Sequence, residues 1–286
     1  MAPLAAVKLN YARWLAMLLL LAVLPRSATA LDVIAKAAVL MNVNSGILLW
    51  TKNQNLQLPP ASTAKILTAS IVLERNRIDE TVRIPAIATK ATGTTIPLAP
   101  GEELNVESLL FAMLLGSAND AALALAHHSG GSVDKFVVLM NRKAQSLGAM
   151  DSKFLNPTGL PQSGQLSTAH GLALITRAAL ANADFRRIVA TKKLPWKSSH
   201  RQDELKNSNR LLDDYKGAIG VKTGNTNEAG FCLVAAASRG NQSYIAVILN
   251  SSEKAVWQDA KRLLDYGFVR EPSDPKRPKR TDKIAW

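Results

Sequence analysis

The order of apolar patterns along the chain is the feature that most limits how it can fold. Residues 35–43 and 47–51 are apolar runs on either side of a turn signal at residues 44–46, which predicts a β-hairpin near the N-terminus. Strand-like runs return in the last third of the chain, at residues 220–223, 230–237 and 243–249. The first and last parts of the chain are therefore predicted to share one sheet.

The middle of the chain favours helices. Apolar residues keep helical spacing in residues 62–74, and further helices are predicted at residues 106–115, 120–128, 136–147, 168–181 and 254–266. Ser132 precedes one of these runs and is interpreted as a helix N-cap, while residues 185–205 are expected to be irregular. The predicted fold class is α+β: an antiparallel sheet formed by N- and C-terminal segments, flanked by helices, with a mainly helical inserted lobe.

The N-terminal residues have the features of an export signal. Two cations precede a short apolar run at residues 14–24, and a small-residue cleavage site ends at Ala30. The run is shorter than the roughly 20 apolar residues that span a bilayer, so a cleaved signal peptide over residues 1–30 is preferred to an uncleaved anchor. We therefore expect an exported protein of the periplasm or cell envelope, with one domain over residues 31–269 and a basic, disordered tail over residues 270–286.

The chain carries a formal net charge of +13, which raises the question of nucleic-acid binding. No nucleic-acid motif accompanies this charge, and an exported protein meets anionic wall polymers or lipid head groups instead. The basic tail is expected to make at most a weak electrostatic contact with such a membrane or wall polymer. The four histidines and the single cysteine, Cys232, form no metal-ligand pattern, so neither a metal nor another cofactor is expected.

Three short motifs together supply the residues for acyl transfer through a serine. The Ser-x-x-Lys pattern alone is close to background, because it occurs four times, beginning at Ser62, Ser132, Ser251 and Ser273. Ser-x-Asn and Lys-Thr-Gly occur once each, so the order of the three motifs carries the prediction. In chain order they are Ser62-Thr63-Ala64-Lys65, Ser117-Ala118-Asn119 and Lys222-Thr223-Gly224.

Ser62 and Lys65 are predicted to be the nucleophile and its base. They are three residues apart at the start of a helix, so the amine can reach the Ser62 hydroxyl. A lysine becomes a base only if its pKa is lowered, and a helix N-terminus and a second cation, here Lys222, both lower it. Ser117 is expected to relay a proton to a leaving amine, and Asn119 to hold either the substrate backbone or Lys65.

The Lys-Thr-Gly strand is predicted to bind the end of the substrate. Lys222 and Thr223 offer a charge and a donor that suit a terminal carboxylate. Gly224 is expected to let the substrate approach the strand without a side-chain clash. The backbone N–H groups of Ser62 and Asn225 are the predicted oxyanion hole, and removal of such a donor typically costs about 10²–10³ in rate.

With these residues, the chain resembles the low-molecular-mass penicillin-binding proteins, the serine D-alanyl-D-alanine carboxypeptidases of bacteria, which share the β-lactamase/transpeptidase-like fold. The resemblance runs from about residue 35 to residue 268 and includes residues 59–62, 156–160, 207–212 and 229–234 besides the motifs. It implies that the D-Ala-D-Ala end of a peptidoglycan stem peptide acylates Ser62, with Lys65 as the base. It also implies that β-lactam antibiotics are covalent inhibitors.

Several alternatives to a carboxypeptidase follow from the same residues. Many relatives carry a C-terminal β-rich domain and a membrane-anchoring helix, whereas this chain ends soon after Phe268. It therefore resembles the shorter members, some of which are endopeptidases on peptidoglycan cross-links, and the choice between the two activities stays open. A class A-type β-lactamase is less favoured, because no Glu-x-x-Leu-Asn string lies between Asn119 and Lys222. A catalytically silent wall-binding protein is also less favoured, because all three motifs are intact.

Overall fold

The structure of the protein, a computed structural model, describes residues 31–198 and 201–270. The predicted signal peptide with its cleavage site, and all but the first residue of the predicted basic tail, lie outside the described residues. None of the helices within the described ranges is long and apolar enough to cross a membrane. From Val33 onward the described residues belong to one structural unit.

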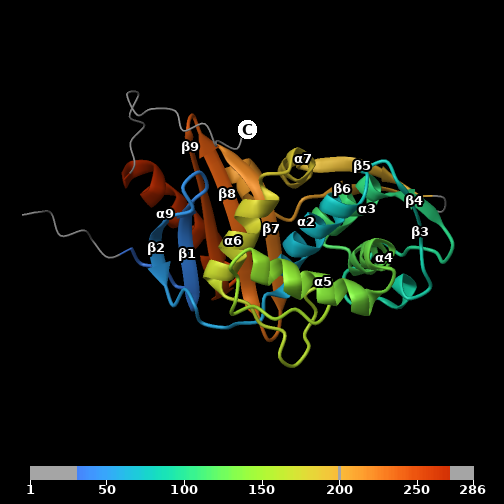
Figure 1. Cartoon of the computed structure of the whole chain (residues 1–286). Helices are drawn as coiled ribbons and strands as arrows, with labels where there is room; N and C mark the ends of the chain where they lie inside the picture. Colours follow the sequence, from blue (N-terminus) through green and yellow to red (C-terminus); the bar gives the residue numbers. More distant parts are fainter. Residues whose placement is uncertain (1–30, 199–200, 271–286) are drawn as a thin grey trace, which may run out of the picture. The chain divides into compact units, whose positions relative to one another are not determined.

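A five-stranded antiparallel sheet joins the N- and C-terminal parts of this unit (Figure 1). Its strand order is β2-β1-β9-β8-β7, so β7 lies at one edge. Val39 lies opposite Val247, which means that the N-terminal hairpin is added directly to the C-terminal strands and confirms the predicted sheet. The strands are β1 (Ala37–Asn42), β2 (Leu48–Lys52), β7 (Ala218–Thr226), β8 (Gly230–Arg239) and β9 (Gln242–Ser251).

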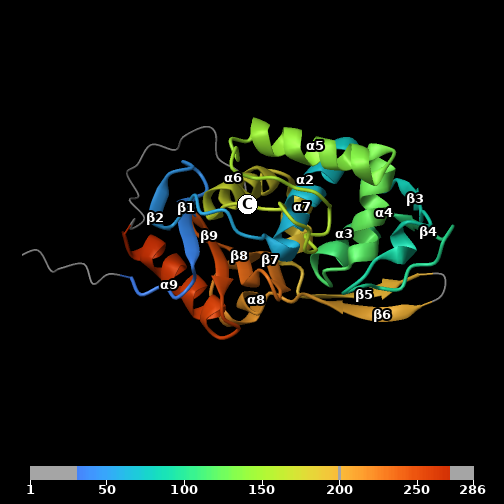
Figure 2. The same ribbon diagram turned by 90° about the horizontal axis from the view of Figure 1, so that it is seen from below.

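Helices cover both faces of this sheet, which explains why its central strands β1, β9 and β8 are apolar without a polar face. Val39 belongs to the core shared with the inserted helices, whereas its neighbour Leu40 faces Gly267 of α9 (Ala255–Arg270) on the other side. Figure 2 shows α9 against one face of the sheet and α6 (Ala169–Ala179) against the opposite face. The alternation of side chains along β1 therefore fixes which residues belong to the helical core and which to the α9 side.

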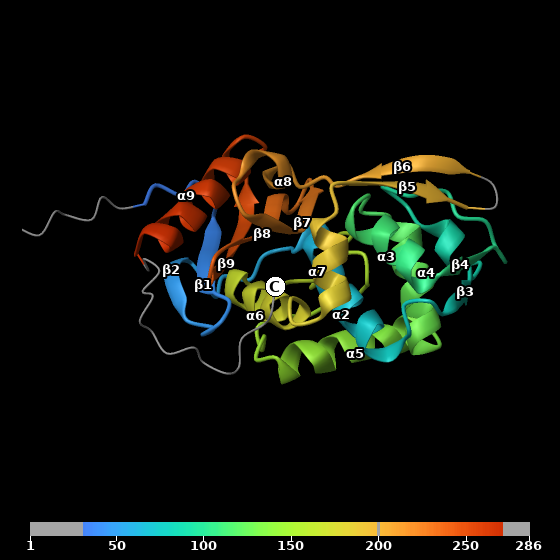
Figure 3. The same cartoon turned by 90° about the horizontal axis from the view of Figure 1, so that it is seen from above.

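The inserted lobe lies between β2 and β7 in sequence and beside β7 in space (Figure 3). At its centre is α2, whose first eight residues are all buried and which contacts α3, α4, α5 and α6. A short two-stranded sheet pairs β3 with β4. The elements of the lobe are η1 (Ala61–Ala64), α2 (Lys65–Arg75), β3 (Thr81–Arg83), η2 (Ala88–Lys90), β4 (Glu103–Asn105), α3 (Val106–Leu114), α4 (Asn119–Gly130), α5 (Val133–Ser146) and α7 (Ala183–Ala190), whereas α8 (Leu211–Asp214) lies beside β7 and near α9.

Short polar side chains begin several of these helices. The Ser132 hydroxyl accepts a hydrogen bond from the Lys135 N–H at 3.2 Å, so the predicted N-cap is confirmed. Thr168 and Asn182 cap α6 and α7 in the same way. These caps satisfy backbone N–H groups that have no partner within the helix.

The expectation that residues 185–205 are irregular is wrong. They contain most of α7 and a β-hairpin of β5 (Lys193–Lys197) and β6 (Gln202–Lys206), which Figure 3 shows along the side of the lobe that carries α3. Alternation is hard to see in β5 because its outward positions include Pro195. Its inward residue Trp196 is buried and donates its indole N–H to the Ser108 carbonyl at 3.2 Å, so tertiary packing forms this hairpin.

Candidate active site

The predicted nucleophile lies in a tight turn. Ser62 belongs to the 3₁₀ turn η1, and the α-helix begins only at Lys65, so the expected helix start at Ser62 is corrected by one turn. Two prolines lead into η1, and Ala61 has a left-handed backbone with φ of 46°. A non-glycine residue in this region is strained, and such strain persists where the surrounding structure enforces it. The turn presents Ser62 half-buried at the start of the central helix α2.

Lys65 is fully buried and surrounded by oxygen atoms. Its Nζ atom lies 2.9 Å from Ser62 Oγ, 2.7 Å from Asn119 Oδ1 and 2.6 Å from the Thr158 carbonyl oxygen. A neutral amine has two N–H donors and one lone pair. The amide and carbonyl oxygens can only accept, so they take both N–H groups. The lone pair then faces Ser62, whose hydroxyl can donate its proton to Lys65 Nζ.

The electrostatics of the site favour this neutral amine. Burial lowers the pKa of Lys65 well below its ordinary value of 10.5, and the charge of Lys222 lowers it further. The charge of Asp120 opposes both effects. The sequence predicted that a helix N-terminus and Lys222 lower the pKa of Lys65. The charge of Lys222 does lower it, but desolvation by burial, which was not predicted, has the larger effect.

The Ser-x-Asn motif lies on the turn between α3 and α4. Ser117 has a left-handed backbone with φ of 62°, and Asn119 is the buried first residue of α4. The Asn119 side chain accepts from Lys65 through Oδ1 and donates through Nδ2 to the Thr92 carbonyl at 2.7 Å. Of the two functions considered for Asn119, the structure shows the contact with Lys65. Ser117 is half-buried on the same turn, and its hydroxyl is not hydrogen-bonded to Ser62 or Lys65 among the described residues.

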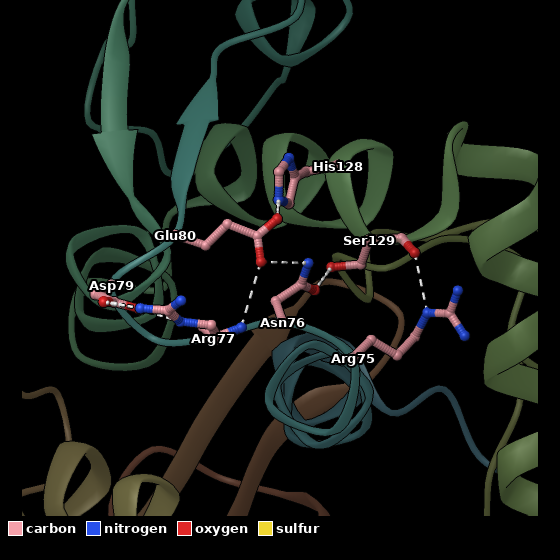
Figure 4. Close-up of polar contacts among 7 residues, drawn as sticks. All are labelled: Arg75, Asn76, Arg77, Asp79, Glu80, His128 and Ser129. Atoms are coloured by element: carbon pink, nitrogen blue, oxygen red, sulfur yellow. Dashed lines mark hydrogen bonds and ion pairs between the residues drawn. The ribbon is translucent and has the colours of Figure 1, made fainter.

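The two helices that carry Lys65 and Asn119 are also joined at their far ends (Figure 4). Beyond the C-terminus of α2, Asn76 accepts through its Oδ1 from the hydroxyl of Ser129, near the end of α4, at 2.5 Å. Glu80 bonds His128 of α4 at 2.7 Å, and the His128 contact lowers the pKa of the Glu80 carboxyl. Contacts at both ends therefore hold α2 beside α4, which keeps their first residues within hydrogen-bond distance.

The third motif lies on the edge strand β7. Lys222 is buried, and burial lowers its pKa from 10.5 to about 7. Its neighbour Thr223 is hydrogen-bonded through its hydroxyl to Ser208 at 2.5 Å. Ser208 lies in residues 207–212, one of the segments in which the chain resembles the penicillin-binding proteins, but no function was predicted for it. The strand thus brings a buried lysine and the Thr223 hydroxyl, which is bonded to Ser208, to the side of the lobe.

Gly224 has a packing function that the sequence did not predict. A Cβ atom on Gly224 would lie 2.8 Å from the backbone nitrogen of Ser62 and 3.0 Å from Ala61 Cβ, both in η1. The glycine therefore allows the nucleophile's own turn to approach β7 closely, and its predicted function of making room for the substrate stays a prediction. Asn225 follows on the same strand and is exposed. The oxyanion hole of the Ser62 and Asn225 N–H groups remains a prediction.

Residues 156–160 form a further wall of the site that motif analysis did not assign. The Thr158 carbonyl accepts from Lys65, and Gly159, with φ of 81°, lies so close to η1 that a Cβ atom would be 1.8 Å from the Ala61 oxygen. Every residue has a backbone carbonyl, so the contact between Thr158 and Lys65 cannot be recognised from residue types. The available signal was the glycine itself, because an adjacent Asn-Pro-Thr-Gly string predicts a tight turn.

Comparisons with known proteins identify the family. The sequence matches the family model described as D-alanyl-D-alanine carboxypeptidase over residues 25–253. The chain belongs to this family. The D-alanyl-D-alanine carboxypeptidase DacF of Bacillus subtilis (strain 168) is 36% identical over 248 residues, which cover 84% of this chain and 64% of that relative. The chain thus spans less than two thirds of the length of this family member.

Other members are matched over more of their length. The D-alanyl-D-alanine carboxypeptidase DacB2 of Mycobacterium tuberculosis is 37% identical over 244 residues, covering 83% of this chain and 84% of the relative. The solved structure of the Streptomyces K15 DD-transpeptidase is 33% identical, with a TM-score of 0.79, and the match covers 83% of this chain and 98% of that one. The family therefore includes relatives named for hydrolysis and a similar structure named for transpeptidation.

Proposed function

We propose that the chain is a serine-type D-alanyl-D-alanine carboxypeptidase that acts on peptidoglycan stem peptides through an acyl-serine intermediate. The observation that carries the proposal is the arrangement around Lys65 Nζ, with two oxygen acceptors and Ser62 Oγ within 2.9 Å. Membership of the family supports the same activity, because several relatives are named for it.

In the proposed reaction, Ser62 Oγ attacks the carbonyl carbon of the penultimate D-alanine while its proton passes to Lys65 Nζ. Backbone N–H groups of Ser62 and Asn225 stabilise the tetrahedral oxyanion. The peptide bond then breaks, and the departing D-alanine amine takes a proton by way of the Ser117 hydroxyl. Water then attacks the ester and loses a proton to Lys65, which is neutral again. The ester C–O bond breaks, Lys65 returns this proton to Ser62 Oγ, and the shortened peptide is released.

Substrate orientation in this proposal depends on the edge strand β7. Lys222 and the Thr223 hydroxyl bind the terminal carboxylate, and the Ser208 hydroxyl at 2.5 Å holds Thr223 in place. A carboxylate near Lys222 favours its charged form, so substrate binding raises the pKa of Lys222 from about 7. The reaction therefore uses one buried lysine as a neutral base and the other as a cation.

The acceptor of the acyl group distinguishes three related activities. Water gives carboxypeptidase or endopeptidase products, and an amine gives transpeptidation, for which the similarity to the Streptomyces K15 DD-transpeptidase is a specific reason. Mass spectrometry of products from a pentapeptide stem, a cross-linked dimer and a pentapeptide with added amine separates them. Loss of one D-alanine from the pentapeptide supports the proposal, whereas cleavage of the dimer alone would make the chain an endopeptidase. A β-lactamase would turn over penicillin instead.

We also propose that penicillins acylate Ser62, because their ring amide resembles the scissile peptide bond. Labelling of the purified protein by fluorescent penicillin tests this. Absence of a covalent label would favour the alternative of a catalytically silent wall-binding protein. The label also reports acylation separately from product release, which makes it the main assay for the variants discussed below.

Export and tail binding are further proposals that the sequence supports. We propose that residues 1–30 direct export to the cell envelope and are then removed, which N-terminal sequencing of the fractionated protein tests. Any contact of the basic tail with anionic surfaces should weaken as salt shortens the Debye length from about 10 Å at 0.1 M. Sedimentation with anionic vesicles, with and without the residues from Pro275 onward, checks this contact, and salt-resistant binding would contradict it.

A further inference from the structure

A segment next to the site has no function in the reaction described so far. Residues 92–98, called the strap below, cross the N-terminus of α4. The first half of the strap is bound by Asn119, whose backbone N–H donates to the Thr94 carbonyl at 2.8 Å and whose Nδ2 donates to the Thr92 carbonyl at 2.7 Å. Gly93 between them allows this approach, because a Cβ atom there would be 3.1 Å from Asn119 Nδ2.

The second half of the strap is bound by the next residue, Asp120. Its Oδ2 accepts from the N–H groups of Ile96 at 3.0 Å and Leu98 at 3.2 Å, and its Oδ1 accepts from Ala121 at 2.9 Å and from Ile96 at 3.3 Å. Asp120 is 1% exposed, and the hydrogen bonds from these backbone donors offset the free-energy cost of removing its carboxylate from water. It belongs to none of the three motifs, and the proposed reaction does not use it.

The strap determines which way the Asn119 amide points. The Thr92 carbonyl can only accept, so it fixes the NH₂ end of the amide toward the strap. The oxygen end must then face Lys65, where it accepts one of the two N–H groups of the neutral amine. An amide turned the other way would present a donor to Lys65 and would no longer direct the lone pair of the amine toward Ser62.

We propose that Asp120 is a positioning residue for the acylation of Ser62. By holding Ile96 and Leu98, it fixes the strap, and the Thr92 carbonyl of the strap fixes the Asn119 amide against Lys65. Asp120 acts through these groups and touches neither the substrate nor the reacting atoms. The inference deepens the proposed function and rests on it, because it requires that Ser62 is the acylated residue.

The test is the variant Asp120→Asn, which keeps the shape of the side chain but places an NH₂ group where backbone donors converge. We expect the second-order rate constant for labelling by fluorescent penicillin to fall at least tenfold at a pH where Lys65 is neutral. Hydrogen exchange at the Ile96 and Leu98 amides should become faster in the folded variant. A purely structural function would change neither the rate per folded molecule nor the pH profile of labelling.

The pH profile provides a second readout. The charged groups that act on Lys65 are Lys222 from β7 and Asp120 from α4, and Asp120 raises the pKa of Lys65. Removal of this negative charge should therefore move the acid limb of the labelling profile to lower pH, besides lowering the plateau. A variant that lowers the plateau without this charge change is Ile96→Pro, which removes one N–H donor and leaves Asp120 in place.

Asp259 offers a matched control. It is a fully buried carboxylate that also accepts from backbone N–H groups, here those of Ile34 at 3.1 Å and Ala35 at 2.9 Å, but it lies on α9, across the sheet from the lobe. Asp259→Asn should destabilise the fold and leave the labelling rate of the folded protein unchanged.

The outcomes separate cleanly. The proposal is overturned if Asp120→Asn labels at the wild-type rate, or if its loss matches that of Asp259→Asn. If Asp120→Asn does not fold, Ile96→Pro decides, and wild-type labelling by that variant would overturn the inference. If the wild-type protein itself takes no label, the proposed function fails rather than the positioning of the strap.

Discussion

Two regions of this molecule have the same Ser-x-x-Lys pattern and use it in opposite ways. Ser132 is in extended backbone and caps α5 through a bond from the Lys135 N–H, while the Lys135 side chain is exposed. Ser62 instead lies in a 3₁₀ turn after a left-handed residue, and Lys65 is buried among three oxygen atoms. The pattern specifies only that the two residues are close along the chain.

What separates the two regions is the packing around the lysine. An exposed lysine keeps its water shell, so neither its charge nor its hydrogen bonds are constrained by the fold. A buried lysine loses that shell, and the fold decides which of its hydrogen-bond partners accept and which can donate. The comparison teaches that this motif becomes reactive only where other segments enclose it.

The largest expected difference is in acylation. Ser62→Ala should abolish covalent labelling by fluorescent penicillin, because among the described residues Ser62 has the one hydroxyl that is hydrogen-bonded to the Lys65 amine. Ser132→Ala should keep full labelling and lose about 0.5–2 kcal/mol of unfolding free energy through the missing cap. A label on the Ser62→Ala protein would show that the wrong serine was assigned.

Substitutions of the lysines in the two Ser-x-x-Lys motifs should differ almost as strongly in their effect on acylation. Lys65→Arg should lower the acylation rate by about 10²–10⁴, because a guanidinium keeps its proton and cannot act as a base. Lys135→Arg should leave the rate unchanged, since that side chain is exposed. Stopped-flow measurement of labelling checks both, and a fully active Lys65→Arg enzyme would remove Lys65 as the base.

Two glycines test whether backbone packing around the serine matters. Gly159→Ala places a Cβ atom 1.8 Å from the Ala61 oxygen, so it should shift η1 and reduce acylation by about tenfold to a hundredfold. Gly131, next to Ser132, also has a left-handed backbone, but a Cβ atom added to it would meet no atom within 4 Å. Gly131→Ala should therefore lower the unfolding free energy by only about 1–2 kcal/mol. Equal acylation by the two variants would mean that η1 tolerates displacement.

The smallest expected effect concerns stability and the other buried lysine. Lys222 has a folded pKa of about 7 against an ordinary value of 10.5, so between these pH values the unfolded chain binds more protons than the folded one. The wild type should therefore gain about 1 kcal/mol per pH unit across that range, relative to a Lys222→Met variant. Below pH 7 the variant should be the more stable protein. Denaturant unfolding at several pH values checks the slope.

Lys135→Met is the control for this last comparison. Its exposed side chain should leave the unfolding free energy within about 0.5 kcal/mol of the wild type at each pH. A pH slope that is the same for the Lys135 and Lys222 variants would show that the effect of Lys222 does not come from its burial.

The sequence predicts the parts of this molecule that depend on local patterns. Turn residues at 44–46 and the apolar runs of the last strands are enough for the sheet, and Ser132 is recognisable as a cap from the run that follows it. The spacing of Ser62 and Lys65 is likewise a local property. These predictions succeed because the physical signal and the residue that carries it lie within a few positions of one another.

The rest depends on contacts between distant segments. The Thr158 carbonyl on Lys65 and the strap amides on Asp120 are backbone groups, and any residue could supply the carbonyl and any residue except proline the amides. The close approach of Gly224 to Ser62 joins positions far apart in sequence, so it could not be predicted from the sequence. The β5–β6 hairpin was missed because Trp196 gains its partner from α3. Tertiary packing decides each of these cases.

The pairing of β1 with β9 has a consequence for how the protein is made. Val39 finds its partner Val247 only after the whole segment from β1 to β9 has been synthesised, and such distant contacts form slowly. A shorter nascent chain can assemble helices around α2, but it lacks Lys222 and the strand that closes on η1. The capacity to acylate Ser62 should therefore be the last property that the growing chain acquires, after most of its helices have formed.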